Sequence, residues 1–406
     1  MSKKMFKLMA SFAMVMILCF CIALPAAAAE PEPGTYADPA KAAITKMLSM
    51  PVGTKTPNAK FIFDFEPKTV EGEKYDDAKK NMPKLGPIEV EFSGSELGIA
   101  LTDGIKTVWV QSKNIVANVT WPNGGEYIYL LKERPGTYDA ADGIKEWMNY
   151  SKAVYEIRVV VDTTADGKTY VAYIFATRKA TDDEKNADEK VSTEPGNGAT
   201  TYSNLTFVNS YAKTNGGGTA NPEKTALDIS KVVTGLGANQ SKYFDFSVTV
   251  TKPKVAFENE TPEYKGLIIG PDTTPNSFIT FKSGESKDIK LKHGQTLVFV
   301  DLPVGSSFTV KELAAAEYKA GYTLKLDGKT MEGKSNEEVN LDLLISSQYI
   351  GEGANIAAFT NTRTGVTPTG IIVDNLPYIT MIALAVLALM SYAAIRFRNY
   401  AVAMNK

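Results

Sequence analysis

Cysteine and histidine are almost absent from this sequence of 406 residues. The two cysteines, Cys19 and Cys21, lie within the first 29 residues, and the one histidine is His293. If those 29 residues are removed on export, the remaining chain has no cysteine, so no disulfide can stabilise it. One histidine also leaves little room for histidine-dependent catalysis or a histidine-based metal site. We therefore expect no metal and no cofactor.

The sequence has no excess of charge of either sign. Lysine and arginine number 44, against 46 for aspartate and glutamate, so there is no electrostatic basis for binding nucleic acid. The G-x-S-x-G and H-E-x-x-H patterns of hydrolases are also missing, which argues against an exported hydrolase. The stretch 162–167 has some features of a calcium-binding loop, but a hairpin turn explains it better.

The N-terminus has the three parts of a secretory signal. Three lysines within the first seven residues are followed by an uncharged run over 8–24. Small residues then fill 25–29, with Ala27 and Ala29 at the spacing that signal peptidase recognises. We predict that residues 1–29 are a signal peptide cleaved after Ala29. An uncleaved membrane anchor is the alternative.

Near the other end, residues 376–395 form an apolar run. Its length matches the roughly 20 residues that a membrane-spanning helix needs. Arg396, Arg398 and Lys406 follow it, so the positive-inside rule predicts that residues 396–406 are a cytoplasmic tail. The bulk of the chain would then lie outside the cell.

A pentapeptide, Val366-Thr367-Pro368-Thr369-Gly370, lies shortly before this run. A Pro-Thr-Gly pentapeptide, an apolar run and a short basic tail, in this order, resemble the sorting signal of surface proteins that a sortase anchors to the cell wall. The resemblance implies cleavage between Thr369 and Gly370 and transfer of the Thr369 acyl group to an amine. The alternative is an ordinary single-pass protein in which Pro-Thr-Gly forms a turn beside the membrane.

The segment between the two ends is predicted to be all-β. Short alternating stretches separated by Gly, Pro and Asn turns are typical of β-sandwiches. The glycine-rich linker 214–222 divides the segment into two tandem sandwich domains, residues 36–213 and 223–363. Short helices are predicted at 143–151 and 337–346, a long loop at 181–200, and a hairpin turn at Asp166-Gly167. Strands are predicted at 61–65, 88–92, 107–110, 127–131, 155–161, 170–177, 243–251, 295–300 and 308–311.

Residues two apart along a strand share one face. By this rule each domain directs one lysine, one glutamate and one asparagine toward its core. They are Lys46, Glu133 and Asn209 in the first domain, and Lys231, Glu312 and Asn361 in the second. Polar residues at strand ends can instead lie at the rim and reach water, and for any single residue this is the simpler interpretation. Two complete sets in the same order favour burial.

Burial would change the chemistry of these groups. Desolvation lowers the pKa of a lysine and raises the pKa of a glutamate. A neutral lysine amine is a nucleophile. A protonated glutamate can polarise the carbonyl of a neighbouring asparagine and shuttle protons as ammonia leaves. The expected products are Lys46–Asn209 and Lys231–Asn361 isopeptide bonds, promoted by Glu133 and Glu312.

The motifs around these residues resemble those of the streptococcal-type major pilins, assembled by sortases on Gram-positive cells. The clearest are residues 227–235 around Lys231, 308–312 with Glu312, and 359–363 with Asn361. The resemblance implies two tandem Ig-like (CnaB-like) β-sandwiches, each with a self-generated isopeptide bond. In the first domain, Lys41, Lys55 and Lys60 are alternatives to Lys46.

The resemblance implies a structural pilin subunit and not an enzyme that turns over. Its partners would be a sortase, other pilin subunits and peptidoglycan or a wall precursor, and its location the pilus or the cell wall. In the relatives, a lysine just before the first-domain asparagine accepts the next subunit. Residues 202–207 contain no lysine here, which leaves Lys190 and Lys213 as candidates. A monomeric or tip-located wall-anchored adhesin, able to bind a host ligand, is therefore the alternative.

Overall fold

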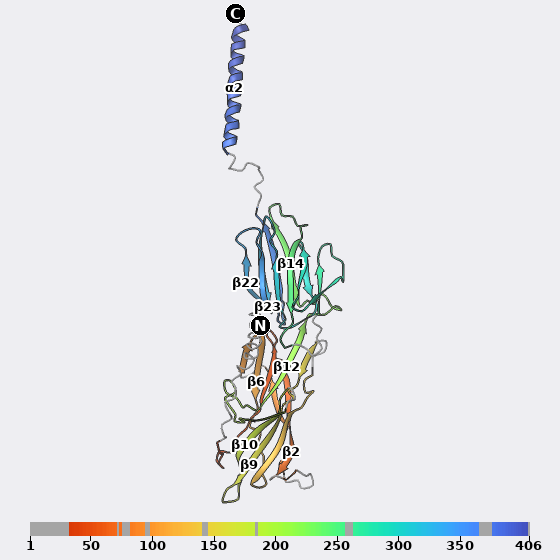
Figure 1. Cartoon of the computed structure of the whole chain (residues 1–406), viewed down its shortest axis with the longest axis vertical. Helices are drawn as coiled ribbons and strands as arrows, with labels where there is room; N and C mark the ends of the chain where they lie inside the picture. Colours follow the sequence, from red (N-terminus) through yellow and green to blue (C-terminus); the bar gives the residue numbers. More distant parts are fainter. Residues whose placement is uncertain are drawn as a thin grey trace, which may run out of the picture.

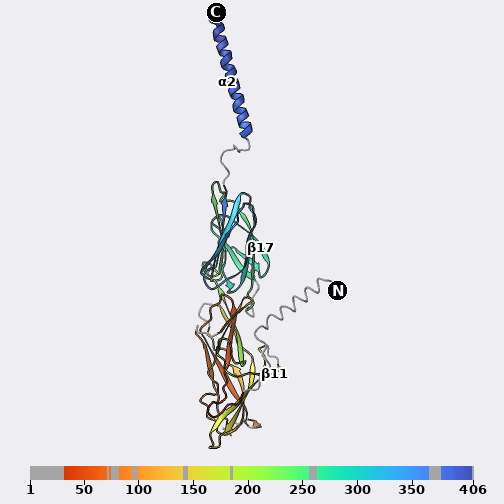
Figure 2. The same ribbon diagram turned by 90° about the vertical axis from the view of Figure 1, so that its left-hand side faces the viewer.

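The structure, a computed structural model, describes residues 32–70, 73–74, 82–93, 98–139, 145–182, 186–255, 263–364 and 376–404. Two β-units are stacked along one long axis (Figure 1), and the elongated form is also clear after a 90° rotation (Figure 2). We call them the first unit, with strands between residues 45 and 215, and the second unit, with strands between 227 and 363. The all-β prediction is confirmed.

The first unit is a sandwich of two sheets. One sheet has the strand order β19-β12-β1-β6-β5, with β8 paired to β12, and takes β19 from the second unit. The other has the order β11-β10-β9-β7-β2-β3, with β4 paired to β2. The strands are β1 (Thr45–Pro51), β2 (Ala59–Val70), β3 (Glu73–Lys74), β4 (Ile88–Phe92), β5 (Gly98–Thr102), β6 (Ile105–Gln111), β7 (Gly125–Glu133), β8 (Glu146–Asn149), β9 (Val154–Thr163), β10 (Thr169–Ala180), β11 (Asn186–Val191) and β12 (Thr206–Asn215).

The second unit is also a sandwich. Its two sheets have the orders β16-β15-β18-β13-β24-β21-β22 and β17-β14-β20-β23. The strands are β13 (Leu227–Gly235), β14 (Phe244–Thr251), β15 (Glu263–Ile269), β16 (Phe278–Lys282), β17 (Ser286–Leu291), β18 (Thr296–Phe299), β19 (Leu302–Pro303), β20 (Ser307–Glu312), β21 (Tyr318–Leu326), β22 (Lys329–Ser335), β23 (Leu343–Tyr349) and β24 (Ile356–Arg363).

Alternation along the strands builds a separate hydrophobic core in each unit. In β14, Phe244, Phe246, Val248 and Val250 are all buried while the residues between them are not. Each such side chain contributes about 1.5 to 3 kcal/mol on burial. The period of two turns aromatic and β-branched residues to one side of the sheet, which is why these segments form strands.

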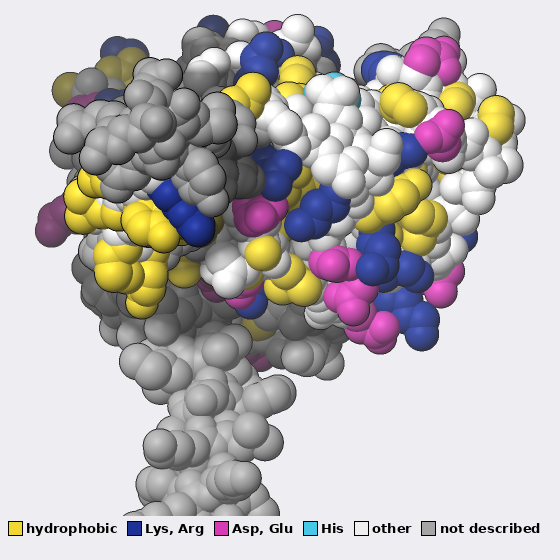
Figure 3. All heavy atoms as spheres, turned by 90° about the horizontal axis from the view of Figure 1, so that it is seen from above, with side chains coloured by type: hydrophobic (Ala, Val, Ile, Leu, Met, Phe, Trp, Pro, Cys, Tyr) yellow, Lys and Arg dark blue, Asp and Glu magenta, His cyan; other side chains and the backbone are white. Residues whose placement is uncertain are grey.

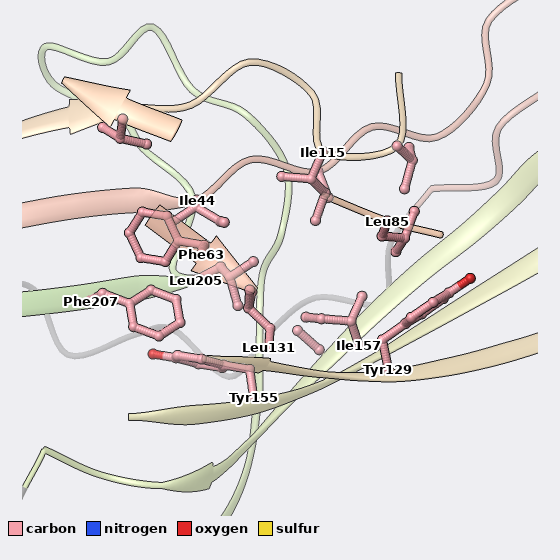
Figure 4. Close-up of a cluster of buried hydrophobic side chains, with 14 of the residues drawn as sticks. Ile44, Phe63, Leu85, Ile115, Tyr129, Leu131, Tyr155, Ile157, Leu205 and Phe207 are labelled. Carbon is pink, nitrogen blue, oxygen red and sulfur yellow. The ribbon is translucent and has the colours of Figure 1, made fainter. Parts of the chain in front are cut away.

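Aromatic rings pack closely in the core of the first unit (Figure 4). The ring centroid of Phe207 lies 4.9 Å from that of Phe63 and 5.2 Å from that of Tyr155. The hydroxyl of Tyr155 donates to the carbonyl of Thr206 at 2.7 Å, so its one polar atom is satisfied. These rings tie β12 to the opposite sheet, because Phe63 lies on β2 and Tyr155 on β9.

The first and last strands of each unit are parallel neighbours. β1 pairs with β12 and β13 pairs with β24, and these are the parallel pairs among the described strands. The chain therefore enters and leaves each unit on adjacent strands of one sheet. This topology brings residues far apart in the sequence into register.

Three predictions of local structure are wrong. Residues 143–151 are not helical where described, since 146–149 form β8, which pairs with β12. Residues 337–346 include the start of β23, whose Leu343 and Ile345 point into the core at a spacing of two. The predicted loop 181–200 contains β11. β8 is too short for an alternation of buried and exposed residues to be recognised. β11 is a polar edge strand paired on one side, so its amino-acid composition resembles that of a loop.

The predicted linker 214–222 is hydrogen-bonded to the second unit. β12 continues to Asn215, and its Thr214 and Asn215 pair with Pro303 and Leu302 of β19. The amide of Gly218 donates to the carbonyl of Val300 at 2.8 Å. One strand thus belongs to the first unit along most of its length and to the second at its end.

The apolar run 376–395 lies in α2 (Leu376–Met404), as a helix was predicted there. By length and hydropathy together, no helix within the described residues reaches what a membrane crossing requires. The predicted signal peptide 1–29 and the pentapeptide 366–370 lie outside the described residues.

Seen down the long axis, basic, acidic and apolar side chains are interspersed on the exposed face (Figure 3).

Candidate functional site

Three polar side chains meet in the core of the first unit. Lys46 on β1, Glu133 at the end of β7 and Asn209 on β12 are all buried. Lys46 Nζ donates to Glu133 Oε2 at 2.9 Å, and Asn209 Nδ2 donates to Glu133 Oε1 at 2.8 Å. One carboxyl group therefore bridges the amine and the carboxamide.

The register of the parallel strands explains why these groups meet. Lys46 is paired with Phe207, and Leu48 with Asn209. Asn209 therefore lies two residues beyond the lysine's neighbour, on the same face of the sheet. Lys46 Nζ also donates to the carbonyl of Phe207 at 3.3 Å and lies 4.7 Å from the centroid of the Phe61 ring. The amine is held toward β12.

The second unit repeats the arrangement. Lys231, Glu312 and Asn361 are each at most 1% exposed. Lys231 Nζ donates to Glu312 Oε1 at 2.5 Å, and Asn361 Nδ2 donates to the same oxygen at 2.6 Å. The amine lies 4.4 Å from the centroid of the Phe244 ring. The register offset is the same, because Lys231 pairs with Phe359 and Val233 with Asn361.

Burial shifts the protonation of both lysine–glutamate pairs. It lowers the pKa of Lys46 and of Lys231 to about 8, against the opposing charge of the neighbouring carboxylate. It also raises the pKa of Glu133 and the pKa of Glu312, which the lysine charges oppose. At a pKa of about 8, roughly a tenth of an amine is neutral at pH 7, far more than for a solvated lysine. The nucleophilic form of each lysine is therefore accessible.

The structure thus brings the six predicted side chains together in two clusters. Each places a nucleophile, a proton carrier and an amide carbon in one dry compartment, which is what condensation with loss of ammonia requires. One detail differs from the expectation. In both units the glutamate accepts from the asparagine Nδ2 and makes no hydrogen bond to the asparagine carbonyl oxygen, which it was expected to polarise.

The alternative first-domain lysines lie at the surface. Lys41 forms an ion pair with Asp38, and Lys60 forms one with Glu89. Lys55 is exposed. Lys46 is therefore the lysine that reaches the buried glutamate.

Of the two candidate acceptor lysines, Lys190 is exposed on the edge strand β11. The side chain of Lys213 is 16% exposed and pairs with Glu352 at 2.9 Å.

His293 has a structural contact, since the amide of Val233 donates to its Nδ1 at 3.0 Å. Residues 162–167 comprise the end of β9 and the turn to β10, in which the amide of Gly167 donates to the carbonyl of Thr164 at 2.9 Å.

Sequence reasoning missed one buried group at the first cluster. The backbone N–H of Ser151 donates to Asn209 Oδ1 at 2.7 Å. No sequence signal could have indicated this contact, because every residue except proline has such an N–H.

In the described part of the chain, no group of three His, Cys, Asp or Glu side chains is arranged to hold a metal ion.

The chain that holds these clusters is similar to one protein-family model and to known pilins. Residues 225–363 match the model of a family described as a domain of unknown function (DUF7601). Over most of its length, the chain is similar to a curated protein of Streptococcus pyogenes serotype M1 named "Pilin". The two are 25% identical over 372 residues, which cover 87% of this chain and 89% of that protein. The predicted resemblance to pilins is confirmed.

Solved pilin structures are also among the matches. One is the crystal structure of the major pilin from S. pyogenes, whose sequence is 18% identical to this chain. The TM-score is 0.33, and the match covers 80% of this chain and 99% of that chain. The major pilin T3.2 from S. pyogenes serotype GAS13637 is 20% identical in sequence to this chain with a TM-score of 0.31, and the match covers 80% of this chain and 98% of that chain. Scores this low support no argument about function. The similarity to the curated pilin supports a pilin role for this chain.

Proposed function

We propose that this chain is a structural pilin subunit in which each β-unit is closed by a self-formed isopeptide bond. The observation that carries the proposal is the repeated cluster of buried lysine, glutamate and asparagine at one register offset in both units. A buried ion pair alone is costly, because each charge loses its hydration. Condensation removes that cost, since it leaves a neutral amide and a neutral acid.

The bond-forming step is the same in both units. The neutral lysine Nζ attacks the asparagine Cγ, so an Nζ–Cγ bond forms and the Cγ–Nδ2 bond breaks. The glutamate takes a proton from Nζ and passes one to Nδ2, which leaves as ammonia. Glu133 contacts both nitrogens through its two oxygens, and Glu312 does so through one.

The bonds would carry tension along the molecule. The first joins β1 to β12, and β12 continues directly to its pairing with β19 in the second unit. The second joins β13 to β24, which ends at Arg363, shortly before the sorting pentapeptide. Load could then pass from one end to the other without unfolding the strands between. In the chain-entropy model, closing loops of this length also stabilises each unit by about 5 kcal/mol.

We further propose that a sortase cleaves between Thr369 and Gly370 and joins Thr369 to another subunit or to the wall. This part rests on the residue order around Val366, Thr367, Pro368, Thr369 and Gly370 and on the similarity to a pilin. It does not rest on a membrane span. Lys190, which is exposed, is a better acceptor than Lys213, which is engaged by Glu352.

Expression in a Gram-positive host with a pilus sortase tests polymerisation. A sortase-dependent ladder of high-mass species on blots is expected, and Thr369→Ala should abolish it. Lys190→Arg should abolish the ladder and Lys213→Arg should not. A single wall-linked band would instead favour the monomeric or tip adhesin, whose partner could be a host surface ligand.

A further inference from the structure

The two clusters differ at the carboxamide oxygen. Asn209 Oδ1 accepts a hydrogen bond from the N–H of Ser151 at 2.7 Å. Asn361 Oδ1 is buried and has no hydrogen-bond partner in the described part of the chain. Both asparagines direct Nδ2 to the glutamate, so within the carboxamide the two clusters differ only at the oxygen. They also differ at the carboxyl group, since Glu133 accepts through both oxygens and Glu312 through Oε1 alone.

The Ser151 amide is held in place by its surroundings. Ser151 is 6% exposed and lies between β8 and β9. Its Oγ donates to Asp182 Oδ1 and accepts from the amide of Ala153 at 3.3 Å. β8 is paired with β12, with Asn149 opposite Ser210, next to Asn209. The donor therefore lies two residues after the end of a strand that is hydrogen-bonded to the strand of the carboxamide.

We propose that the backbone N–H of Ser151 stabilises the oxyanion that forms on Asn209 in the first-unit reaction. The proposal rests on the isopeptide function proposed above. When Lys46 Nζ bonds to Asn209 Cγ, the carbonyl π electrons move onto Oδ1, which becomes negative. When the Cγ–Nδ2 bond breaks, that electron pair returns to the carbonyl and ammonia leaves with the proton supplied by Glu133. A fixed N–H at Oδ1 stabilises the negative charge in a water-free site.

This assigns separate tasks to the two groups that hold the Asn209 carboxamide. Glu133 contacts Lys46 Nζ and Asn209 Nδ2, so it handles the proton at the nucleophile and at the leaving group. Ser151 contacts the oxygen, so it stabilises the charge there; the same N–H also acts on the neighbouring Glu133 carboxyl and lowers its pKa, against the effect of burial. The second unit has no such backbone donor among its described residues, and its reaction is an internal comparison.

The test removes the N–H and leaves the side chain in place. Ser151 is replaced by its α-hydroxy analogue, which converts one peptide bond to an ester in the full-length chain. Newly made chains are pulse-labelled, and loss of ammonia is followed for each unit by the mass of the peptides that contain Asn209 and Asn361. The matched control is the same ester at Asp166, in the exposed β9–β10 turn.

Removal of one oxyanion donor typically slows a reaction by about 100- to 1,000-fold. The ester at Ser151 should slow bond formation in the first unit to that extent and leave the second unit unchanged, while the ester at Asp166 changes neither. An unchanged first-unit rate would overturn the inference but not the proposed function. Failure of the unmodified chain to lose ammonia at all would overturn the proposed function.

A second measurement does not depend on folding of the ester. In the full chain carrying Glu133→Ala, which should not form the first-unit bond, hydrogen exchange at the Ser151 amide should be slow. Adding Asn209→Ala should speed that exchange at least 10-fold, because the acceptor is lost. Equal exchange in the two chains would show that the amide is not bound to Asn209.

Discussion

Asn209 lies two residues beyond the residue that pairs with Lys46 across the parallel strands β1 and β12. Asn361 has the same offset from Lys231 on β13 and β24. Residues two apart share a face, so each asparagine lies in the same layer as its lysine. The sheets of the two units differ in size and in strand order, yet this relationship is kept. It is therefore the strongest argument for one chemistry in both.

The unlinked first unit should show an unusual dependence on pH. In Asn209→Ala no bond can form, and Lys46 and Glu133 remain free to titrate. The pKa of Lys46 is about 8 in the folded chain and 10.5 in the unfolded chain. Between these values the unfolded chain binds more protons, so the free energy of unfolding rises as pH rises from 8 to 10.5.

Glu133 gives the opposite slope at lower pH. Its pKa is raised above 4.5 in the folded chain, so above pH 4.5 the folded chain binds more protons and the free energy of unfolding falls as pH rises through the raised pKa. Urea unfolding followed by tryptophan fluorescence reports on this unit, since all three tryptophans, Trp109, Trp121 and Trp147, lie in it. Adding Lys46→Met should remove the rise between pH 8 and 10.5; persistence of that rise would contradict the assignment to Lys46.

Two buried asparagines of the second unit should behave differently when replaced. Asn355 Oδ1 accepts from the amides of Asp327 and Gly351 at 3.0 Å, and its Nδ2 donates to the carbonyl of Ala226 at 3.0 Å. Asn355→Ala should lower the free energy of unfolding by about 2 to 4 kcal/mol, because several hydrogen bonds are lost. It should leave the loss of ammonia from Asn361 intact.

Asn361→Ala should instead abolish loss of ammonia from the second unit and leave the first unit unaffected. Peptide mass spectrometry and urea unfolding of the same samples separate the two effects. If Asn355→Ala blocked the second bond in folded protein, Asn355 would have a chemical role that its contacts do not indicate.

The junction between the units should depend on Glu352. Its Oε2 pairs with Lys213 at 2.9 Å, and its Oε1 accepts from the amide of Lys55 at 2.6 Å. Both side chains of the ion pair are largely buried. Glu352→Ala removes contacts worth about 1 to 3 kcal/mol, so opening at the junction should become roughly 10-fold more frequent. Limited proteolysis within residues 216–218 measures this opening, and Glu317→Ala, an exposed glutamate elsewhere in the second unit, is the control.

An unchanged cleavage rate in Glu352→Ala would mean that other contacts hold the junction. The pairing of Asn215 with Leu302 and the hydrogen bond from Asn215 Nδ2 to the carbonyl of Gly351 at 2.9 Å would then be the next to test.

The sequence was informative where local periodicity decides the outcome. Glu133 follows Tyr127, Tyr129 and Leu131 at steps of two, and all four are buried. The register between Lys46 and Asn209 was not predictable in this way, because it depends on pairing between strands more than 150 residues apart. The short helix predicted at 337–346 is wrong because Leu343 and Ile345 of β23 are buried at a spacing of two, which is the period of a strand. The contact of the Ser151 amide depends on where β8 lies beside β12, and no side-chain pattern encodes that.

The mass of the intact chain tests self-formed cross-linking most directly. Once the N-terminus has been sequenced, the measured mass should be two ammonia molecules below the mass that the sequence requires. Glu133→Ala and Glu312→Ala should each restore one ammonia, and the double variant both. Glu126→Ala, which removes a glutamate on the outer face of β7, should restore neither. A folded chain with the full mass required by its sequence would contradict both bonds.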